Sequence, residues 1–87
     1  MRFEDSKDFR KDLKRLPIDI QNAAIDAINN VADADSFGDI HHLKSLKGFP
    51  NYYRIRIRNY RMGMFWTGDR FLIETIAPRG DFYKHFP

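Results

Sequence analysis

The clearest indication of the fold of this 87-residue chain comes from residues 52–66 in its second half, which read YYRIRIRNYRMGMFW. From residue 52 to residue 58, apolar or aromatic side chains come to alternate with arginines. This period of two is typical of a β-strand with one buried face. Because Arg58-Asn59 can serve as a two-residue turn, the residues from Tyr60 onward are predicted to form a second strand that pairs with the first.

The predicted turn sets a register that sorts the side chains of this hairpin onto two faces. Arg56 then faces Arg61, and Arg54 faces Gly63, which is expected to leave an opening there. A slip of one residue would mix the two faces. The face expected to pack on helices carries Tyr53, Ile55, Ile57, Tyr60, Met62 and Met64, and the other carries Tyr52, Arg54, Arg56, Arg61, Gly63 and Phe65.

Two amphipathic helices are predicted before the hairpin. Phe9, Leu13 and Leu16 form the apolar stripe of the first helix. Asp5 is suited to cap its N-terminus, and Pro17 ends it. Pro17 also suits the first turn of a second helix. The apolar stripe of that helix consists of Ile20, Ala24, Ile28 and Val31.

The remaining segments complete one domain. Residues 33–39 have turn chemistry and predict a loop, and Gly68-Asp69 predicts a turn into a strand that begins at residue 70 or 71 and ends near residue 77. A chain of this length is too short for two domains. We therefore expect residues 1–87 to form a single α+β domain, in which an N-terminal helical hairpin packs on a small twisted antiparallel β-sheet.

The composition excludes several kinds of chemistry. The chain has no cysteine, which rules out disulfides, thiolate catalysis and cysteine zinc sites and suits a reducing compartment. His41 and His42 are adjacent, a spacing that argues against a shared metal site, and no cofactor is expected.

Charged residues begin at Arg2 and no stretch approaches the length of a membrane span, so a cytoplasmic protein is predicted.

Charge is distributed unevenly along the chain. Residues 1–43 carry six basic and nine acidic side chains, whereas residues 44–87 carry nine basic and three acidic ones. This asymmetry indicates a polyanionic partner for the second half. A solvated strand surface is the alternative explanation.

Arg54, Arg56 and Arg61 are expected to lie together on one exposed face, which points to the nature of that partner. Like charges opposite each other work against sheet stability, whereas a phosphate backbone compensates them, because guanidinium groups bind phosphate oxygens bidentately. Tyr52 and Phe65 border the same face, where they can stack on unpaired bases. The pattern favours single-stranded RNA. Protection of a sheet edge against aggregation is the alternative.

Several segments together resemble the RelE/ParE toxin superfamily, and their order and spacing carry the resemblance over nearly the whole chain. They are Leu46-Lys47-Gly48, Tyr53-Arg54-Ile55-Arg56-Ile57, Tyr60-Arg61, and Arg79 with Phe82-Tyr83-Lys84. The resemblance implies a single RelE-like toxin domain with the RelE-like microbial RNase fold, in which a helical hairpin precedes a three-stranded antiparallel sheet.

For the RelE branch, the resemblance implies the toxin of a type II toxin–antitoxin system. Such a toxin is a metal-independent endoribonuclease that cleaves messenger RNA on the ribosome by attack of a ribose 2′-hydroxyl on the adjacent phosphate. The implied partners are a cognate antitoxin protein, messenger RNA, and the ribosome with its 16S ribosomal RNA.

The resemblance also implies roles for particular residues. The catalytic set is Arg54, Arg56, Arg61, Arg79 and Tyr83. The three strand arginines would stabilise the phosphorane, because arginine keeps its proton too firmly for ordinary acid–base catalysis. Tyr83 would stack on the base beside the cleavage point and take part in proton transfer. The residues expected to bind RNA are Lys47, Tyr52, Arg58, Phe65 and Lys84.

Some features leave the function open. Several RelE members have lysine where this chain has Arg54 and Arg56, and many have histidine where it has Pro78, which removes one candidate for proton transfer. Glu74 either orients Arg61, acts as a base, or only reduces repulsion among the arginines. Because the ParE branch shares the fold, a ParE-like non-enzymatic inhibitor of DNA gyrase is the alternative function, and a catalytically inactive member of the superfamily is a third possibility. The complete catalytic set favours the ribonuclease.

Overall fold

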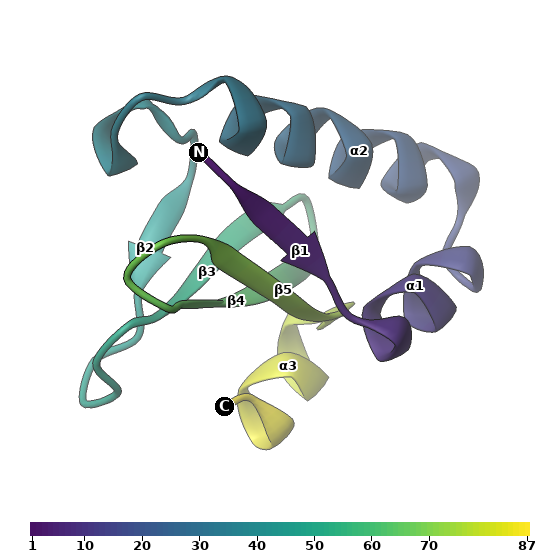
Figure 1. Ribbon diagram of the computed structural model, residues 1–87. Coiled ribbons are helices and arrows are strands. Elements are labelled where there is room, and N and C mark those ends of the chain that lie inside the picture. Colours follow the sequence, from purple (N-terminus) through teal and green to yellow (C-terminus); the bar gives the residue numbers. More distant parts are fainter.

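A twisted sheet with strand order β1-β5-β4-β3-β2 organises the chain in this computed structural model, which describes residues 1–87 (Figure 1). The elements, in chain order, are β1 (Phe3–Asp5), α1 (Lys7–Lys14), α2 (Ile18–Asp33), a 3₁₀ turn (Phe37–Asp39), β2 (Leu43–Ser45), β3 (Tyr52–Ile57), β4 (Tyr60–Trp66), β5 (Phe71–Pro78) and α3 (Arg79–His85). The α+β class and the helical hairpin are therefore confirmed. The sheet has five strands where three were expected, and β1 pairs with β5 in parallel.

The central hairpin has the predicted register. Arg56 pairs with Arg61, Arg54 with Gly63, and the turn lies at Arg58-Asn59. Arg58 adopts a φ of 54°, the left-handed conformation that two-residue hairpin turns require. The alternation of side chains in residues 52–58 thus predicted both the pairing and the face of each residue.

The two edge strands were not predicted. β1 and β2 have three residues each, too few to display a period. Their positions depend on backbone pairing with distant residues: the Phe71 N–H donates to the Arg2 carbonyl at 3.0 Å, and the Leu46 N–H donates to the Tyr52 carbonyl at 2.9 Å.

The N-terminus of α1 is capped by Ser6, not by Asp5. The Phe9 N–H donates to Ser6 Oγ at 3.0 Å, and Ser6 has the extended backbone of a capping residue. Asp5 instead ends β1 and forms an ion pair with Arg10 at 3.0 Å. The prediction of Asp5 as the cap was wrong because it ignored the strand that precedes the helix.

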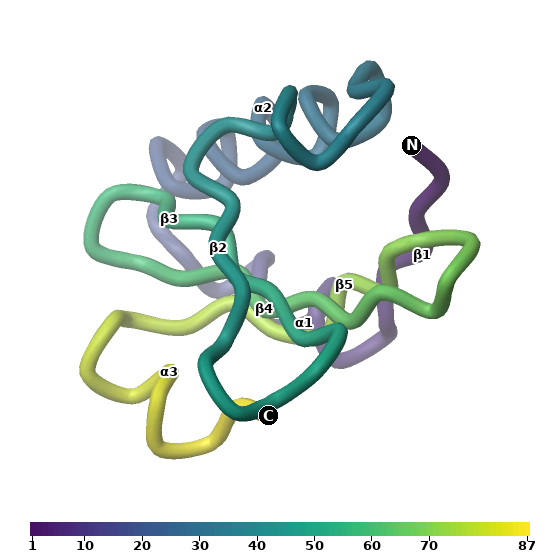
Figure 2. Tube along the Cα trace, turned by 90° about the vertical axis from the view of Figure 1, so that its left-hand side faces the viewer, coloured from purple at the N-terminus to yellow at the C-terminus, as the bar shows by residue number.

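Helices cover both sides of the sheet. In Figure 1, α2 lies on one side and α3 on the other, and the perpendicular view in Figure 2 shows the same arrangement. The core between α1, α2 and the sheet includes Phe9, Ile20, Ala24, Val31, Ile55, Ile57, Met62, Met64, Phe71, Ile73 and Ile76. The arginine-bearing face of the hairpin therefore points to the side of α3. No helix has the combination of length and apolar character needed to cross a lipid bilayer.

A β-bulge in β5 explains how Ile73 and Ile76 both reach the core. Residues three apart on a regular strand point to opposite faces. Opposite Gly63 and Met64 the register shifts, so that Thr75 pairs with Gly63 and Ile73 with Met64. Glu74 is the extra residue of the bulge, so it has no partner on β4 in this register.

Candidate functional site

A hollow with a volume of about 320 Å³ lies where β2, β3 and β4 meet. Its lining consists of His42, Leu43, Lys44, Arg54, Arg56 and Arg61. Lys44 and Arg54 are paired across β2 and β3, and Arg56 and Arg61 across β3 and β4. Four of the six side chains are cationic and none is acidic. We refer to this site as the cationic hollow.

Arg61 is buried in the wall of the cationic hollow, with 9% of its surface exposed. Its Nη1 donates to the carbonyl oxygens of Arg58 and Tyr60, both at 2.9 Å, while its buried Nε has no hydrogen-bond partner. The expectation that all three arginines are exposed was therefore wrong for Arg61. A buried charge without an acidic partner is costly, and an anion in the hollow would lower that cost.

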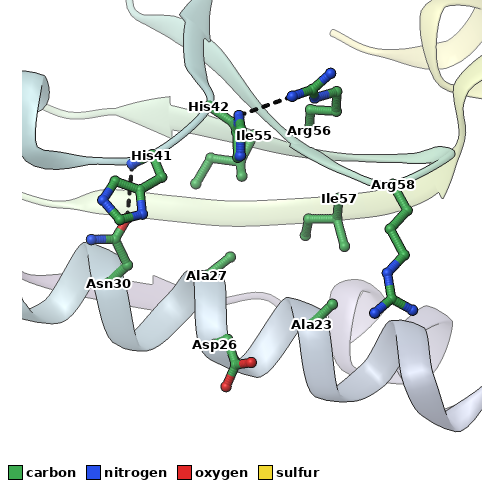
Figure 3. Close-up of a pocket in the computed structure, with 10 residues that line it drawn as sticks. All are labelled: Ala23, Asp26, Ala27, Asn30, His41, His42, Ile55, Arg56, Ile57 and Arg58. Carbon is green, nitrogen blue, oxygen red and sulfur yellow. Dashed lines mark hydrogen bonds between the residues drawn. The ribbon is translucent and has the colours of Figure 1, made fainter.

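Arg54 and Arg56 are both held by His42. Nη1 of Arg54 donates to the His42 carbonyl oxygen at 3.0 Å. Nη2 of Arg56 lies 3.1 Å from His42 Nδ1, as the dashed line in Figure 3 marks. The two strand arginines therefore reach the hollow with fixed orientations.

Sequence reasoning missed the contributions of His42 and Lys44. Both depend on β2, which places residues 42–45 beside β3. Residues 43–46 read Leu-Lys-Ser-Leu and do not alternate between apolar and polar side chains, so the sequence carries no local signal for this strand.

Arg79, Tyr83 and Lys84 lie on α3, outside the lining of the cationic hollow. The Arg79 N–H donates to the Asn59 carbonyl at 2.8 Å, which holds the start of α3 beside the β3–β4 turn. Tyr83 is 51% exposed, and its ring meets the edge of Phe82 at a centroid distance of 5.0 Å. The structure thus brings three of the five predicted catalytic residues into one hollow and leaves two on the neighbouring helix.

The two predicted stacking residues belong to an aromatic cluster at the C-terminus. The ring of Tyr52 lies 4.8 Å from that of Phe65 and 5.6 Å from that of Phe86. A Cβ atom on Gly63 would lie 2.8 Å from Phe86 and 2.9 Å from Phe82. The opening expected at Gly63 is therefore filled by aromatic rings. Tyr52 and Phe65 are half-buried.

The two remaining predicted RNA-binding residues are exposed and lie outside the cationic hollow. Arg58 forms an ion pair with Asp19 of α2 at 2.7 Å. Lys47 lies in the loop between β2 and β3, beside a separate hollow of about 430 Å³.

Glu74 is not paired with the arginines of the cationic hollow. Its carboxylate forms no ion pair with any of them, so the proposed orientation of Arg61 by Glu74 has no contact to support it. Burial raises the pKa of the Glu74 carboxyl above its ordinary value, because desolvation disfavours the charged form.

A second hollow, of about 300 Å³, lies between α2 and β3 (Figure 3). It shares His42 and Arg56 with the cationic hollow. Near its rim, the His41 N–H donates to Asn30 Oδ1 at 2.8 Å, which ties the loop after α2 to that helix. His42 and Arg56 therefore stand between the two hollows. No three His, Asp or Glu side chains of the chain are grouped so that they can share a metal ion.

Comparison with known proteins shows that this chain is similar in sequence to a known toxin. No protein-family model matches it. It is 36% identical over 83 residues to Toxin RelE3 of Methanocaldococcus jannaschii, with 94% of each chain covered.

Two solved structures have the same fold. A chain of the RelB-RelE antitoxin-toxin complex from Methanococcus jannaschii superposes with a TM-score of 0.80 and 33% identity over the whole of both chains. A chain of an archaeal RelE-RelB complex from Pyrococcus horikoshii has a TM-score of 0.71, covering 91% of this chain and 94% of its own. At 22% identity, this second likeness concerns the fold alone.

Proposed function

This chain belongs to the RelE family of toxins from type II toxin–antitoxin systems, and from that premise we propose that it is an endoribonuclease that cleaves messenger RNA on the ribosome. Inhibition of translation follows from loss of the message. The observation that supports this activity is the cationic hollow, where Arg61 is buried without an acidic partner beside Arg54 and Arg56. Such a site is suited to a phosphate group.

The proposed reaction is attack of a ribose 2′-hydroxyl on the adjacent phosphorus, with departure of the 5′-oxygen. Negative charge builds up on the phosphate oxygens as the phosphorane forms. Arg54, Arg56 and Arg61 donate N–H groups to those oxygens, and because the strands hold them in place, little reorganisation is needed during the reaction. Arginine has no acceptor and keeps its proton, so these residues act by electrostatic stabilisation and not as acid or base. The reaction requires no metal.

Residues on α3 complete the proposed site. Tyr83 stacks on the base beside the cleaved bond and exchanges a proton with the reacting oxygens. Arg79, at the start of α3, contributes a further positive charge to the proposed site. Lys47, Arg58 and Lys84, all exposed, contact the backbone of messenger or 16S ribosomal RNA, and Tyr52 and Phe65 support bases at the edge of the aromatic cluster.

The decisive test is cleavage of messenger RNA by purified protein on programmed ribosomes. Arg54→Ala should lower the single-turnover rate by about 100-fold, the usual effect of removing one donor to a developing oxyanion. Lys11→Ala, which removes an exposed lysine of α1, is the matched control and should cleave like the wild type. Equal rates for Arg54→Ala and Lys11→Ala would contradict the assignment of the cationic hollow.

Two further results bear on the mechanism and on the alternative function. Full cleavage by Tyr83→Phe would exclude Tyr83 from proton transfer. If expression of the protein produced DNA breaks while translation continued, inhibition of DNA gyrase would replace cleavage of messenger RNA as the function.

We also infer a cognate antitoxin, because two structures with this fold are complexes of RelE with RelB. The chain offers such a protein two unlike surfaces, an acidic helical first half and a basic sheet face. A small reading frame beside the gene should restore growth when it is expressed together with the toxin. Failure of every neighbouring frame to do so would contradict this inference.

A further inference from the structure

His42 touches both arginines that β3 contributes to the cationic hollow. We propose that His42 is a positioning residue, which holds Arg54 and Arg56 toward bound phosphate and holds Arg56 only while its imidazole is neutral. The inference rests on the proposed phosphate-binding role of the hollow. It deepens that role by making the arrangement of the arginines depend on pH.

The backbone of His42 supports this role. Its φ of 63° lies in the left-handed region, which few residues other than glycine adopt, although histidine is among the more tolerant ones. Strained backbone of this kind persists where the surrounding structure demands it, often at functional sites. Here the conformation accompanies a carbonyl oxygen that accepts from Arg54 Nη1 at 3.0 Å and from the Arg56 backbone N–H at 3.4 Å.

The contact with Arg56 defines the protonation state of the His42 ring. Arginine has donors but no acceptor, so Nδ1 of His42 has to accept the hydrogen bond from Arg56 Nη2. The imidazole is then neutral and carries its proton on Nε2. In Figure 3 the His42 ring and the Arg56 guanidinium face each other across this contact. If Nδ1 also carried a proton, two N–H donors would point at each other and the hydrogen bond would be lost.

A proton on Nδ1 would also add a positive charge to a site that is already cationic. The imidazolium of His42 and the guanidinium of Arg56 would then repel each other. Asp26 is the one carboxylate that lines either hollow. In Figure 3 it points away from the contact between His42 and Arg56. The charged and titratable groups facing the two hollows are Lys44 from β2, Arg54 and Arg56 from β3, Arg58 from the β3–β4 turn, Arg61 from β4, His41 from the preceding loop and Asp26 from α2.

Protonation of His42 should therefore affect catalysis and binding differently. The released guanidinium of Arg56 no longer points reliably at the phosphate, so the rate of the chemical step falls. The imidazolium adds a positive charge beside the hollow, so attraction for RNA is retained. Acidification is expected to lower kcat without raising KM.

Two substitutions of His42 separate its ring from its backbone. Asparagine tolerates the left-handed conformation, supplies an acceptor oxygen and does not titrate. Glycine tolerates the same conformation and keeps the carbonyl oxygen for Arg54, but it removes the acceptor for Arg56. His42→Asn is thus the conservative variant, and His42→Gly is the variant that loses positioning of Arg56.

The kinetic test compares cleavage on programmed ribosomes at pH 7.5 and pH 5.5. At pH 7.5 we expect His42→Gly to lower kcat by about tenfold, the usual effect of losing one hydrogen bond to a charged group, with KM within about twofold of the wild type. His42→Asn should stay within about threefold of the wild type. At pH 5.5 the wild type should fall toward His42→Gly, whereas His42→Asn should lose less activity. Equal kcat for His42→Gly and the wild type at both pH values would overturn the proposal.

A spectroscopic test on the free protein does not depend on cleavage. The ¹⁵N chemical shifts of the His42 ring at pH 7.5 should show the proton on Nε2, and Arg56→Ala should weaken that preference. A proton on Nδ1 would overturn the proposal even if the protein proved to be a ribonuclease. Absence of cleavage by a wild-type protein with the proton on Nε2 would instead refute the proposed function and support the His42–Arg56 contact.

Discussion

Arg61 illustrates how the surroundings of a single residue change its chemical role. The hairpin register placed it correctly opposite Arg56, but β4 is a central strand, and the nearby backbone encloses the side chain. Carbonyl oxygens of Arg58 and Tyr60 replace part of the lost water. The buried guanidinium is consequently more rigid than an exposed one, which suits a group that has to meet a developing charge.

Gly63 is the residue whose substitution should disturb the domain most directly. We expect Gly63→Ala to lower the free energy of unfolding by about 1–3 kcal/mol, because the added methyl group would press on the rings of Phe82 and Phe86. Gly80→Ala is the control, since a Cβ atom there meets nothing within 4 Å. That control should leave stability unchanged or raise it by up to about 1 kcal/mol through helix propensity. Urea denaturation measures both, and equal stabilities would contradict the packing.

Glu74 should make stability depend on pH. Its pKa is raised in the folded state by burial, so its contribution is most favourable when the carboxyl is protonated, below about pH 4, and it is lost as pH rises and the group ionises. Glu74→Gln removes this loss. We expect the variant to have a higher Tm than the wild type at pH 7 and a much smaller advantage at pH 3. A pH-independent difference in Tm would show that burial of the charge is not its cause.

At the scale of the element, short segments behaved differently from long ones. The stripes of α1 and α2 and the alternation in β3 repeat often enough to identify each element. β1 and β2 have three residues each and exist because a neighbouring strand offers hydrogen-bond partners. The consequence for the site is large, since β2 brings His42 and Lys44 to the arginines.

The start of α1 gives a test at this scale. Ser6→Ala should lower the free energy of unfolding by about 1 kcal/mol, because the Phe9 N–H loses its acceptor. Asp5→Ala, which removes only the exposed ion pair with Arg10, should cost less than about 1 kcal/mol. Chemical denaturation of the two variants compares these costs. A larger loss for Asp5→Ala would return the capping role to Asp5.

At the scale of the whole molecule, the charges that stabilise the fold are separate from the charges of the cationic hollow. Arg70 pairs with Glu4 and with Asp69, which also pairs with Arg2, so these contacts tie β1 to the β4–β5 turn. The hydrogen bond to Glu4, followed by that to Asp69, raises the pKa of the Arg70 guanidinium further. Lys44, Arg54, Arg56 and Arg61 have no ion-pair partner within the chain.

This separation predicts different responses to salt. If the four cations of the hollow neutralise RNA phosphates, the logarithm of the binding constant for a single-stranded RNA should fall with log salt at a slope of about −2 to −3. The free energy of unfolding should change little over the same range, because exposed ion pairs contribute little to it. Fluorescence anisotropy and urea denaturation measure the two quantities. RNA binding that is insensitive to salt would contradict a phosphate-binding hollow.

The helical hairpin, the register of β3 and β4 and the common face of Arg54, Arg56 and Arg61 could all be predicted from the sequence, because each follows from a local period of apolar side chains. Three features became visible only in the folded chain: Arg61 is buried, Phe82 and Phe86 fill the space at Gly63, and His42 holds Arg54 and Arg56. These contacts join residues distant in the sequence or depend on strands too short to show a period. Their formation depends on how the finished elements pack, which local sequence patterns do not encode.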